Sequence, residues 1–289
     1  MIYVIIPVHN RKEFTRGCLQ SLQAQTYRDF QTIVIDDGST DGTATMIAAE
    51  FPEVKVLSGD GQLWWTKAIN WGVRYVLERA DLEAHDAVLT LNDDLMVAPD
   101  YLASIVADQQ QQQVPCLMGS VSVDINNPTY LEYAGTACNY ITGKTVRLSR
   151  RFANNLNCLK ASHSVLASDD LPGRGTLIPV TVFQQVGLYD ERNFPHYMAD
   201  IELSVRARRA GFPLFVSVGS VIHNYVEATR NKRQSWRSFL NGFTSFMAPN
   251  YLRTRYVFAL RHSPIKHLYF LLDISRITAS FLCSRFAVE

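Results

Sequence analysis

Two adjacent carboxylates, Asp36 and Asp37, stand with Gly38 at the end of an apolar run that is typical of a buried strand. Carboxylates and a glycine turn at the carboxyl end of a strand can accept hydrogen bonds from a nucleobase and a ribose. The same residues could equally form a capping turn ahead of the next helix. The cluster therefore indicates either a nucleotide pocket or a helix cap.

A second acidic pair, Asp93 and Asp94, follows Asn92 directly after another apolar run. Adjacent carboxylates repel each other unless a cation is present, and a hard divalent ion is often held by one or two carboxylates together with substrate phosphates. The alternative is a solvated loop ahead of Pro99. The chain contains neither a GxGxxG nor a GxxxxGK[ST] sequence, so neither a dinucleotide fingerprint nor a P-loop is supported.

Three further polar residues lie later in the chain. Asp200 stands at the expected start of a helix, where the helix dipole favours a carboxylate, so its plain alternative is an N-cap. Glu202 is two residues away and must point in a different direction, so one acid can face a site while the other holds a neighbour. His223 follows the expected last strand; a single histidine is more often structural, but one near a metal pair could be a ligand.

The elements that position these groups alternate along the chain, with apolar runs predicting strands and apolar residues three and four apart predicting helices. We expect strands at residues 2–7, 31–36, 54–57, 87–91, 116–123 and 214–218, and helices at 12–25, 41–50, 64–79, 99–113, 179–186 and 200–210. This order predicts an α/β, Rossmann-like fold, a mostly parallel sheet flanked by helices, with the ligand beyond the carboxyl ends of the strands. Residues 124–175 are expected to form irregular loops over the site.

The 289 residues are 47% hydrophobic and 19% charged, which is a globular composition and excludes a disordered chain. The five cysteines are widely spaced and form no CxxC pair, so neither a disulfide framework nor a zinc site is indicated. The first residues are typical of a buried strand rather than a signal peptide, and no apolar stretch is long enough to span a membrane. We therefore expect a protein of the reducing cytoplasm.

The charge is divided unevenly between two parts of the chain. Residues 1–229 carry 18 Lys/Arg against 25 acids, whereas residues 230–289 carry ten against two. The second part mixes aromatic residues with arginine in two or three amphipathic helical patterns, broken near Pro249 and Pro264. We expect residues 1–229 to form the main domain and residues 230–289 a basic helical extension, which could bind an anionic membrane surface or pack as a hairpin or dimer interface.

The order of the motifs resembles that of family 2 glycosyltransferases with the GT-A fold. IPVHNR begins the series, DDGSTDGT follows the second expected strand, and the Asp-rich pair follows the fourth. Asp200 opens a D-x-E-x-x-x-R sequence that is followed by Ala210-Gly211, the last strand and a histidine. The resemblance covers about residues 1–225, and residues 59–70 and 173–179 are similar to the subgroup described as rhamnosyl- or galactofuranosyltransferase-like.

The resemblance implies a role for each residue that matches the family's motifs. Asp200 would be the catalytic base, and Asp36 would recognise uracil or thymine. Asp94 would be the metal-binding acid of the D-x-D motif, whose first acid is Asn92 here, and His223 would be a further metal ligand. We expect Asp36, Asp94, Asp200 and His223 to converge on one pyrophosphate-bearing ligand. The nucleotide-sugar pocket would also contain Pro7, Val8, His9, Asn10, Asp37, Gly38, Asp60, Gly61, Trp65, Asn70, Asn92 and Asp93.

The resemblance also implies a function. We expect an inverting glycosyltransferase that moves rhamnose from dTDP-rhamnose, or galactofuranose from a UDP donor, to a hydroxyl of a glycan or lipid-linked acceptor in bacterial surface polysaccharides such as the lipopolysaccharide O-antigen. Its cofactor would be a divalent ion, Mn²⁺ or Mg²⁺. It would lie peripherally on the inner face of the plasma membrane, could form a homodimer, and would have no nucleic-acid partner.

Three points stay open at this stage. Arg174 could contact a phosphate or pair with Asp169 or Asp170. A sugar-nucleotide nucleotidyltransferase is an alternative enzyme, although the loop HNRKEF lacks the glycines usual in that class. A non-catalytic nucleotide-sugar or glycan-binding module is the other alternative, because Asn92 and Ala199 stand where the family often has acids.

Overall fold

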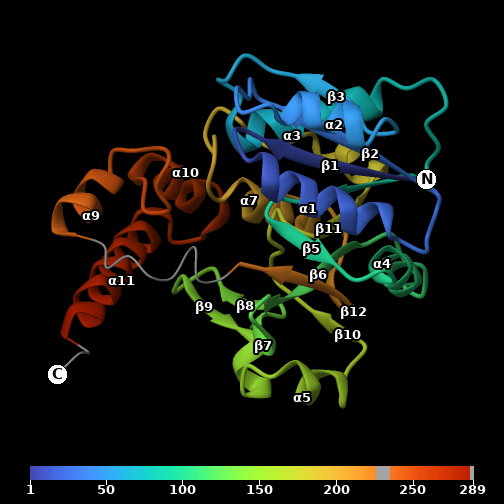
Figure 1. Cartoon of the computed structure of the whole chain (residues 1–289). Helices are drawn as coiled ribbons and strands as arrows, with labels where there is room; N and C mark the ends of the chain where they lie inside the picture. The colour runs from blue at the N-terminus through green and yellow to red at the C-terminus, as the bar shows by residue number, and fades with distance from the viewer. Residues whose placement is uncertain (226–234, 287–289) are drawn as a thin grey trace.

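The computed structural model describes residues 1–225 and 235–286 (Figure 1). The strands within these residues are β1 (Ile2–Val8), β2 (Phe30–Asp36), β3 (Lys55–Ser58), β4 (Ala87–Thr90), β5 (Leu95–Val97), β6 (Leu117–Asp124), β7 (Asn127–Tyr133), β8 (Thr136–Asn139), β9 (Lys144–Arg147), β10 (Val165–Ala167), β11 (Thr176–Pro179) and β12 (Leu214–Asn224). The helices are α1 (Lys12–Gln23), α2 (Thr43–Glu50), α3 (Trp64–Leu77), α4 (Tyr101–Gln110), α5 (Leu156–Lys160), α6 (Val180–Val186), α7 (Ala199–Arg209), α9 (Trp236–Gly242), α10 (Leu252–His262) and α11 (Lys266–Phe286), with a 3₁₀ turn at Leu148–Phe152.

One mixed sheet runs through the body of the described chain in the order β10-β12-β6-β11-β4-β1-β2-β3. Strands β1 to β4 are parallel to their neighbours in this set, and β12 is parallel to β6. β11 is inserted antiparallel between β4 and β6. The expected mostly parallel sheet with flanking helices is therefore confirmed, with antiparallel strands added beside its parallel half.

The parallel half of the sheet is buried on both faces, as its continuous apolar runs require. Along β1, Tyr3 and Ile5 pack in one core cluster that includes α3, whereas Val4 and Ile6 pack in the other, which includes α1 and α2. Gly72 lets α3 approach the sheet closely, because a Cβ at this position would overlap Ile5. These two cores hold the strand ends at fixed positions.

The strand registers bring the polar sequence clusters to one edge of the sheet. Val8 of β1 pairs with Asp36 of β2, which pairs in turn with Ser58 of β3. The amide of Leu91, just beyond β4, donates to the carbonyl oxygen of Ile5 on β1. Residues 9–11, 37 and 92–94 therefore emerge from adjacent strands at the same edge, where a ligand of a parallel sheet is expected.

Four segments differ from the sequence expectation, and two of them are β5 and β11, which were not expected as strands. Residues 124–175 were expected to be irregular, but they contain β7 to β10, the 3₁₀ turn and α5. Their strands contain few buried residues, so they lack the continuous apolar runs that mark buried strands. β12 runs on to Asn224 through a register irregularity between Ser217 and Val221, so His223 lies within the strand rather than after it.

The C-terminal helices α9, α10 and α11 lie to one side of the sheet domain (Figure 1). Three helices with breaks at residues 243–251 and 263–265 match the expected amphipathic extension. The extension is joined to the body by buried polar contacts, among them the Nε2 atom of His262, which lies 3.2 Å from Glu202 Oε1 on α7. The expected boundary between residues 229 and 230 lies outside the described residues. None of the helices described here combines the length and the apolar character needed to cross a bilayer.

Candidate active site

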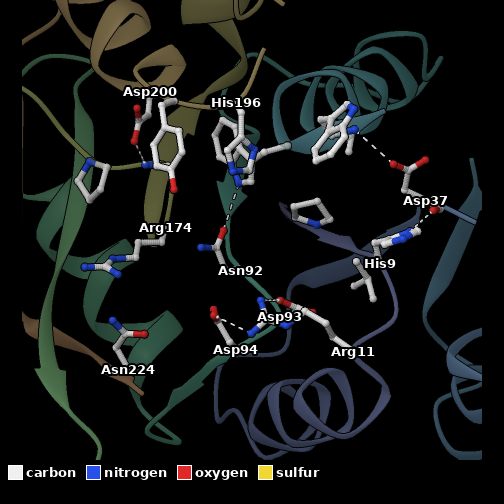
Figure 2. A pocket seen from close by; sticks show the side chains of 18 of the residues that line it. His9, Arg11, Asp37, Asn92, Asp93, Asp94, Arg174, His196, Asp200 and Asn224 are labelled. Carbon is white, nitrogen blue, oxygen red and sulfur yellow. Dashed lines mark hydrogen bonds and ion pairs between the residues drawn. The ribbon is translucent and has the colours of Figure 1, made fainter. Parts of the chain in front are cut away.

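A cavity of about 750 Å³ opens at the carboxyl-end edge of the sheet. Figure 2 shows the polar side chains around it, which come from the loops after β1, β2 and β4, from β12, from the loops ahead of β11 and α7, and from the start of α7. The expected site residues on its wall are Pro7, Val8, His9, Asp37, Gly61, Trp65, Asn92, Asp93, Asp94, Arg174 and Asp200. One cavity thus unites residues spread over almost two hundred positions.

Asp37 organises the loop at one side of the cavity. Its carboxylate accepts hydrogen bonds from the backbone amides of Gly61 at 2.8 Å, Leu63 at 2.9 Å and Trp64 at 3.2 Å. The carbonyl oxygen of Asp37 can only accept, so the contact with His9 Nδ1 places a proton on that nitrogen. Asp37 therefore fixes the backbone that presents Trp64 to the cavity.

Asp36 does not line the cavity, contrary to the expectation that it meets the ligand. It is buried, and its Oδ1 accepts a hydrogen bond from the backbone amide of Ser39 at 3.1 Å. Asp36 is the last residue of β2, and Asp37, directly after the strand, is the one that lines the cavity. Gly38 follows with a φ of +68°, and a Cβ there would lie 2.9 Å from the amide nitrogen of Gly61. Asp37 is the acid of this pair that reaches the cavity.

The second acidic cluster lies at the end of β4 and faces Arg11, the residue that precedes α1. The guanidinium of Arg11 places Nη1 3.3 Å from Asp93 Oδ1 and Nη2 3.0 Å from Asp94 Oδ2. Burial raises the pKa of Asp93 to about 7, Arg11 opposes this rise, and Asp94 adds to it. Asn92, in place of a first acid, accepts a hydrogen bond from Trp65 Nε1 at 3.2 Å.

These acids suit a hard divalent ion in part. Asp93 Oδ2 is buried and has no hydrogen-bond partner among the described residues, and Asp94 is open to the cavity. Carboxylate oxygens are suitable ligands for Mg²⁺ or Mn²⁺, with the remaining positions filled by phosphates and water. In residues 1–225 and 235–286, no group of three or more His, Cys, Asp or Glu is arranged to hold a metal ion. The protein therefore offers a metal ion two carboxylates at this position, those of Asp93 and Asp94.

His223 does not join this set. It lies on β12 beside Met96 of β5 and Val123 of β6, and its neighbour Asn224 lines the cavity instead. Burial first, and the positive charge of Lys160 second, lower the pKa of His223. Strand alternation turns adjacent residues to opposite sides, so only one of this pair can face the ligand. The expectation that His223 is a ligand beside Asp94 does not match this placement.

Asp200 lies at the wall opposite the acidic pair, at the start of α7 (Figure 2). Its Oδ2 accepts a hydrogen bond from the backbone amide of Gly173 at 2.8 Å, and its Oδ1 accepts one from the amide of Ile201 at 2.9 Å. A Cβ at Gly173 would overlap the ring of Trp65, so glycine allows this close backbone approach. Burial raises the pKa of Asp200, which makes its carboxylate a stronger base.

Glu202 points away from the cavity, as its spacing from Asp200 predicts. Its carboxylate pairs with Arg206 Nε at 2.8 Å and with His262 Nε2 at 3.2 Å. Only 1% of the Glu202 side chain is exposed. One acid of this helix thus faces the site, and the other holds the helix against the C-terminal extension.

Arg174 pairs with a residue that the sequence did not indicate. Its Nη2 lies 3.2 Å from Glu132 Oε2, which also accepts from Ser122 Oγ and Asn224 Nδ2. Burial by itself would raise the pKa of Glu132, but Arg174 and these two donors hold it below its usual range. Asp169 instead pairs with Arg208, and Asp170 accepts from Thr136. Arg174 thus lines the cavity while it is paired with Glu132.

The other expected residues support the site from outside it. Asn70 is buried and donates to the carbonyl oxygen of Tyr189 at 2.8 Å, and Asp60 accepts from the amide of Gln62. Asn10 accepts a hydrogen bond from the amide of Thr40 at 2.7 Å. The wall residues that the sequence analysis did not assign are Arg11, Trp64, Ala68, Pro172, Gly173, His196, Tyr197, Met198, Asn224 and Tyr225. Most lie within three or four residues of an assigned one, which is the signal that could have found them.

Among these additions, His196 is a polar group of the cavity wall with a nitrogen left unsatisfied by the described residues. Its Nδ1 is buried and has no hydrogen-bond partner within the described residues. Its ring contacts Tyr197 edge-on at 4.7 Å and Trp64 at 6.3 Å between centroids. Burial lowers the pKa of His196, so the ring is neutral at neutral pH. An aromatic rim with a neutral imidazole suits a sugar ring.

Curated relatives match most of this chain at low identity. The chain is 24% identical over 221 residues to the N-acetylglucosaminyl-diphospho-decaprenol L-rhamnosyltransferase of Mycobacterium tuberculosis, covering 73% of this chain and 72% of the relative. It is 23% identical over 238 residues to the low-salt glycan biosynthesis hexosyltransferase Agl10 of Haloferax volcanii, covering 82% and 72%.

Solved structures share the fold. A crystal structure of GalNAc-T7 with UDP, GalNAc and Mn²⁺ matches with a TM-score of 0.64 and 19% identity; the match covers 95% of this chain but only 55% of that one. The mannosyltransferase PcManGT from Pyrobaculum calidifontis, in complex with GDP-Man and Mn²⁺, matches with a TM-score of 0.60 and 16% identity, covering 100% and 75%.

Family models match the chain along nearly its whole length. The model described as glycosyl transferase family 2 matches residues 3–162, and the model described as glycosyl transferase family group 2 matches residues 87–288. Together with the sheet order and the cavity at its carboxyl-end edge, these matches show that the chain belongs to the family 2 glycosyltransferases.

Proposed function

We propose that this glycosyltransferase inverts the anomeric centre of its donor sugar, with Asp200 as the base that activates the acceptor hydroxyl. The observation that carries the proposal is the opposition of Asp200 to the Asp93 and Asp94 pair across one cavity. A diphosphate held near the acidic pair leaves the anomeric carbon between the two walls. An acceptor hydroxyl beside Asp200 then attacks from the side opposite the leaving group.

Each wall contributes a distinct chemical role. Asp200 takes the proton of the acceptor hydroxyl as the new glycosidic bond forms. Arg174 offers donors to the diphosphate, while Asp37 and His9 hold the loops around the nucleotide. Mn²⁺ or Mg²⁺, held by Asp94 with Asp93 and by the diphosphate, would supply the neutralisation of charge on the leaving group.

The donor class follows from chemistry and from the relatives. We propose dTDP-rhamnose as the favoured donor, with a UDP-linked galactofuranose as the alternative, because uracil and thymine present the same pairing edge to a carboxylate. The rhamnosyltransferase name of the M. tuberculosis relative supports rhamnose, and its decaprenol-linked substrate supports a lipid-linked acceptor in polysaccharide synthesis.

A panel of nucleotide sugars tests the proposal. We expect the purified chain with Mn²⁺ to release dTDP or UDP from one matching donor, to be inhibited by EDTA, and to be restored by excess Mn²⁺ or Mg²⁺. The readout is the nucleoside diphosphate formed, measured with and without a lipid-linked acceptor. Donor binding without release would favour the non-catalytic module, and pyrophosphate release from a nucleoside triphosphate would favour the nucleotidyltransferase. Full activity in EDTA would contradict the metal assignment.

The C-terminal extension presents an apolar face that suits a membrane surface. Leu268, Leu271 and Leu272 are 54%, 60% and 40% exposed and lie three and four residues apart on one side of α11. Exposed Lys266 lies two residues before this face in the sequence, and exposed Arg253 lies on the preceding helix, α10. We propose that the extension associates peripherally with anionic lipid, which would bring the cavity near a lipid-linked acceptor.

Charge placed on this face should weaken the association. Leu271→Glu is expected to reduce co-sedimentation with phosphatidylglycerol-containing vesicles by about tenfold, because a buried leucine contributes about 1.5–3 kcal/mol in an apolar environment. Val114→Glu, which adds the same charge at an exposed position of the sheet domain, is the matched control. Equal binding by both variants would contradict the membrane proposal, and a change only in oligomeric state would favour a dimer interface.

A further inference from the structure

Arg11 occupies the space between the two acids at the end of β4. It precedes α1, and its side chain is 40% exposed. A single guanidinium contacts Asp93 Oδ1 at 3.3 Å and Asp94 Oδ2 at 3.0 Å, and its carbon lies 4.9 Å from the centre of the Phe14 ring. Figure 2 shows Arg11 reaching both acids from the β1 side of the cavity. Asp93 and Asp94 are therefore already paired with a positively charged side chain of the protein itself.

The arrangement satisfies the acids only in part. Asp93 Oδ2 is buried and has no hydrogen-bond partner among the described residues, although Asp93 Oδ1 faces Arg11. Asp94 is 28% exposed and turned to the cavity. A divalent ion that binds these same oxygens must approach the position of the guanidinium, and the two positive charges repel at such distances. Arg11 and the ion therefore compete for one pair of carboxylates.

We propose that Arg11 is a built-in competitor of the divalent ion, holding Asp93 and Asp94 while the donor is absent and leaving them when the ion arrives with a diphosphate. The inference rests on the proposed metal-assisted function of this site. A released guanidinium needs a new anionic partner, and a diphosphate in the cavity supplies one. The ion and the nucleotide then bind cooperatively, because each removes an obstacle to the other.

Metal binding without turnover tests the proposal. We expect Arg11→Gln to bind Mn²⁺ alone, with no nucleotide present, about tenfold or more tightly than the unaltered chain, because the repelling charge is gone. Titration calorimetry or the electron paramagnetic resonance signal of free Mn²⁺ gives the affinity. Adding UDP should reduce the difference in Mn²⁺ affinity between Arg11→Gln and the unaltered chain, because the diphosphate of UDP gives the Arg11 guanidinium another partner. Arg11→Lys keeps the positive charge but loses the planar guanidinium. Its Mn²⁺ affinity should lie between those of the unaltered chain and Arg11→Gln.

Two matched variants locate the effect. Arg16→Gln removes the same charge from α1, the helix that Arg11 precedes, where Arg16 pairs with Glu13 and Glu50, and should leave Mn²⁺ affinity unchanged. Arg11→Gln combined with Asp94→Asn should lose the gained binding. The inference is overturned if Arg11→Gln binds Mn²⁺ no more tightly than Arg16→Gln or shows no measurable binding. Nucleotide release by the unaltered chain, measured separately, decides the proposed function independently of this result.

Discussion

Asp200→Asn is expected to lower the turnover of sugar transfer by about 10²-fold or more, because an amide cannot take the proton of the acceptor hydroxyl. The amide can still accept the hydrogen bond from Gly173 that holds Asp200 Oδ2 at 2.8 Å, so the start of α7 should keep its position. The affinity for the donor should therefore change little. Initial rates at saturating donor and acceptor, with donor affinity from calorimetry, measure both quantities.

Asp100→Asn is the matched control for this experiment. Asp100 is an exposed acid at the N-terminal end of another helix, α4, and makes no side-chain capping hydrogen bond. It should retain normal turnover. Because burial raises the pKa of Asp200, the rate should fall as the pH drops through that raised value, and this acid limb should disappear from the residual activity of Asp200→Asn. Near-normal turnover in Asp200→Asn would remove Asp200 as the base.

Glu202→Ala is expected to destabilise the fold by about 3–5 kcal/mol, the usual cost of removing one partner from a buried ion pair. The Glu202 side chain is 1% exposed, and its loss leaves Arg206 without the carboxylate 2.8 Å from Nε and His262 without the one 3.2 Å from Nε2. The contact with Arg206 lies within α7, and the contact with His262 joins α7, which carries Asp200, to α10 of the extension. The free energy of unfolding in urea measures the change.

The pH dependence of this contribution has a definite sign. Burial by itself would raise the pKa of Glu202, but the hydrogen bond from His262 and the charge of Arg206 lower it below its usual value. A carboxylate with a lowered pKa in the folded state stabilises the fold above the pKa of the unfolded chain, about 4.3, and loses that effect as the pH falls further. Glu53→Ala, at an exposed loop position, is the control. The prediction would be contradicted if Glu202→Ala lowered the free energy of unfolding no more than Glu53→Ala does.

The family and the broad fold could be predicted from the sequence because their signals are local. Apolar runs and helical spacing located β1 to β4 and their helices within a few residues, since each pattern reflects which side chains must be buried. The two-residue spacing of Asp200 and Glu202 on a helix also predicted correctly that their side chains point in different directions. Strands β7 to β10 contain few buried residues, so they lack such a signal and were not expected.

The sequence by itself therefore determined the alternation of strands and helices, the edge of the sheet that carries the site, and the acids present there. Only the tertiary structure decided that Asp37 rather than Asp36, and Asn224 rather than His223, faces the cavity. Side chains along a strand alternate between its two faces, so a shift of one residue reverses which side chain meets the cavity. The register irregularity between Ser217 and Val221 means that the residues of β12 that face the cavity cannot be found by counting along its sequence. The pairing of Arg11 with Asp93 and Asp94 depends in the same way on which strands become neighbours, because β1 and β4 adjoin in the sheet although α1 to α3 separate them in the chain.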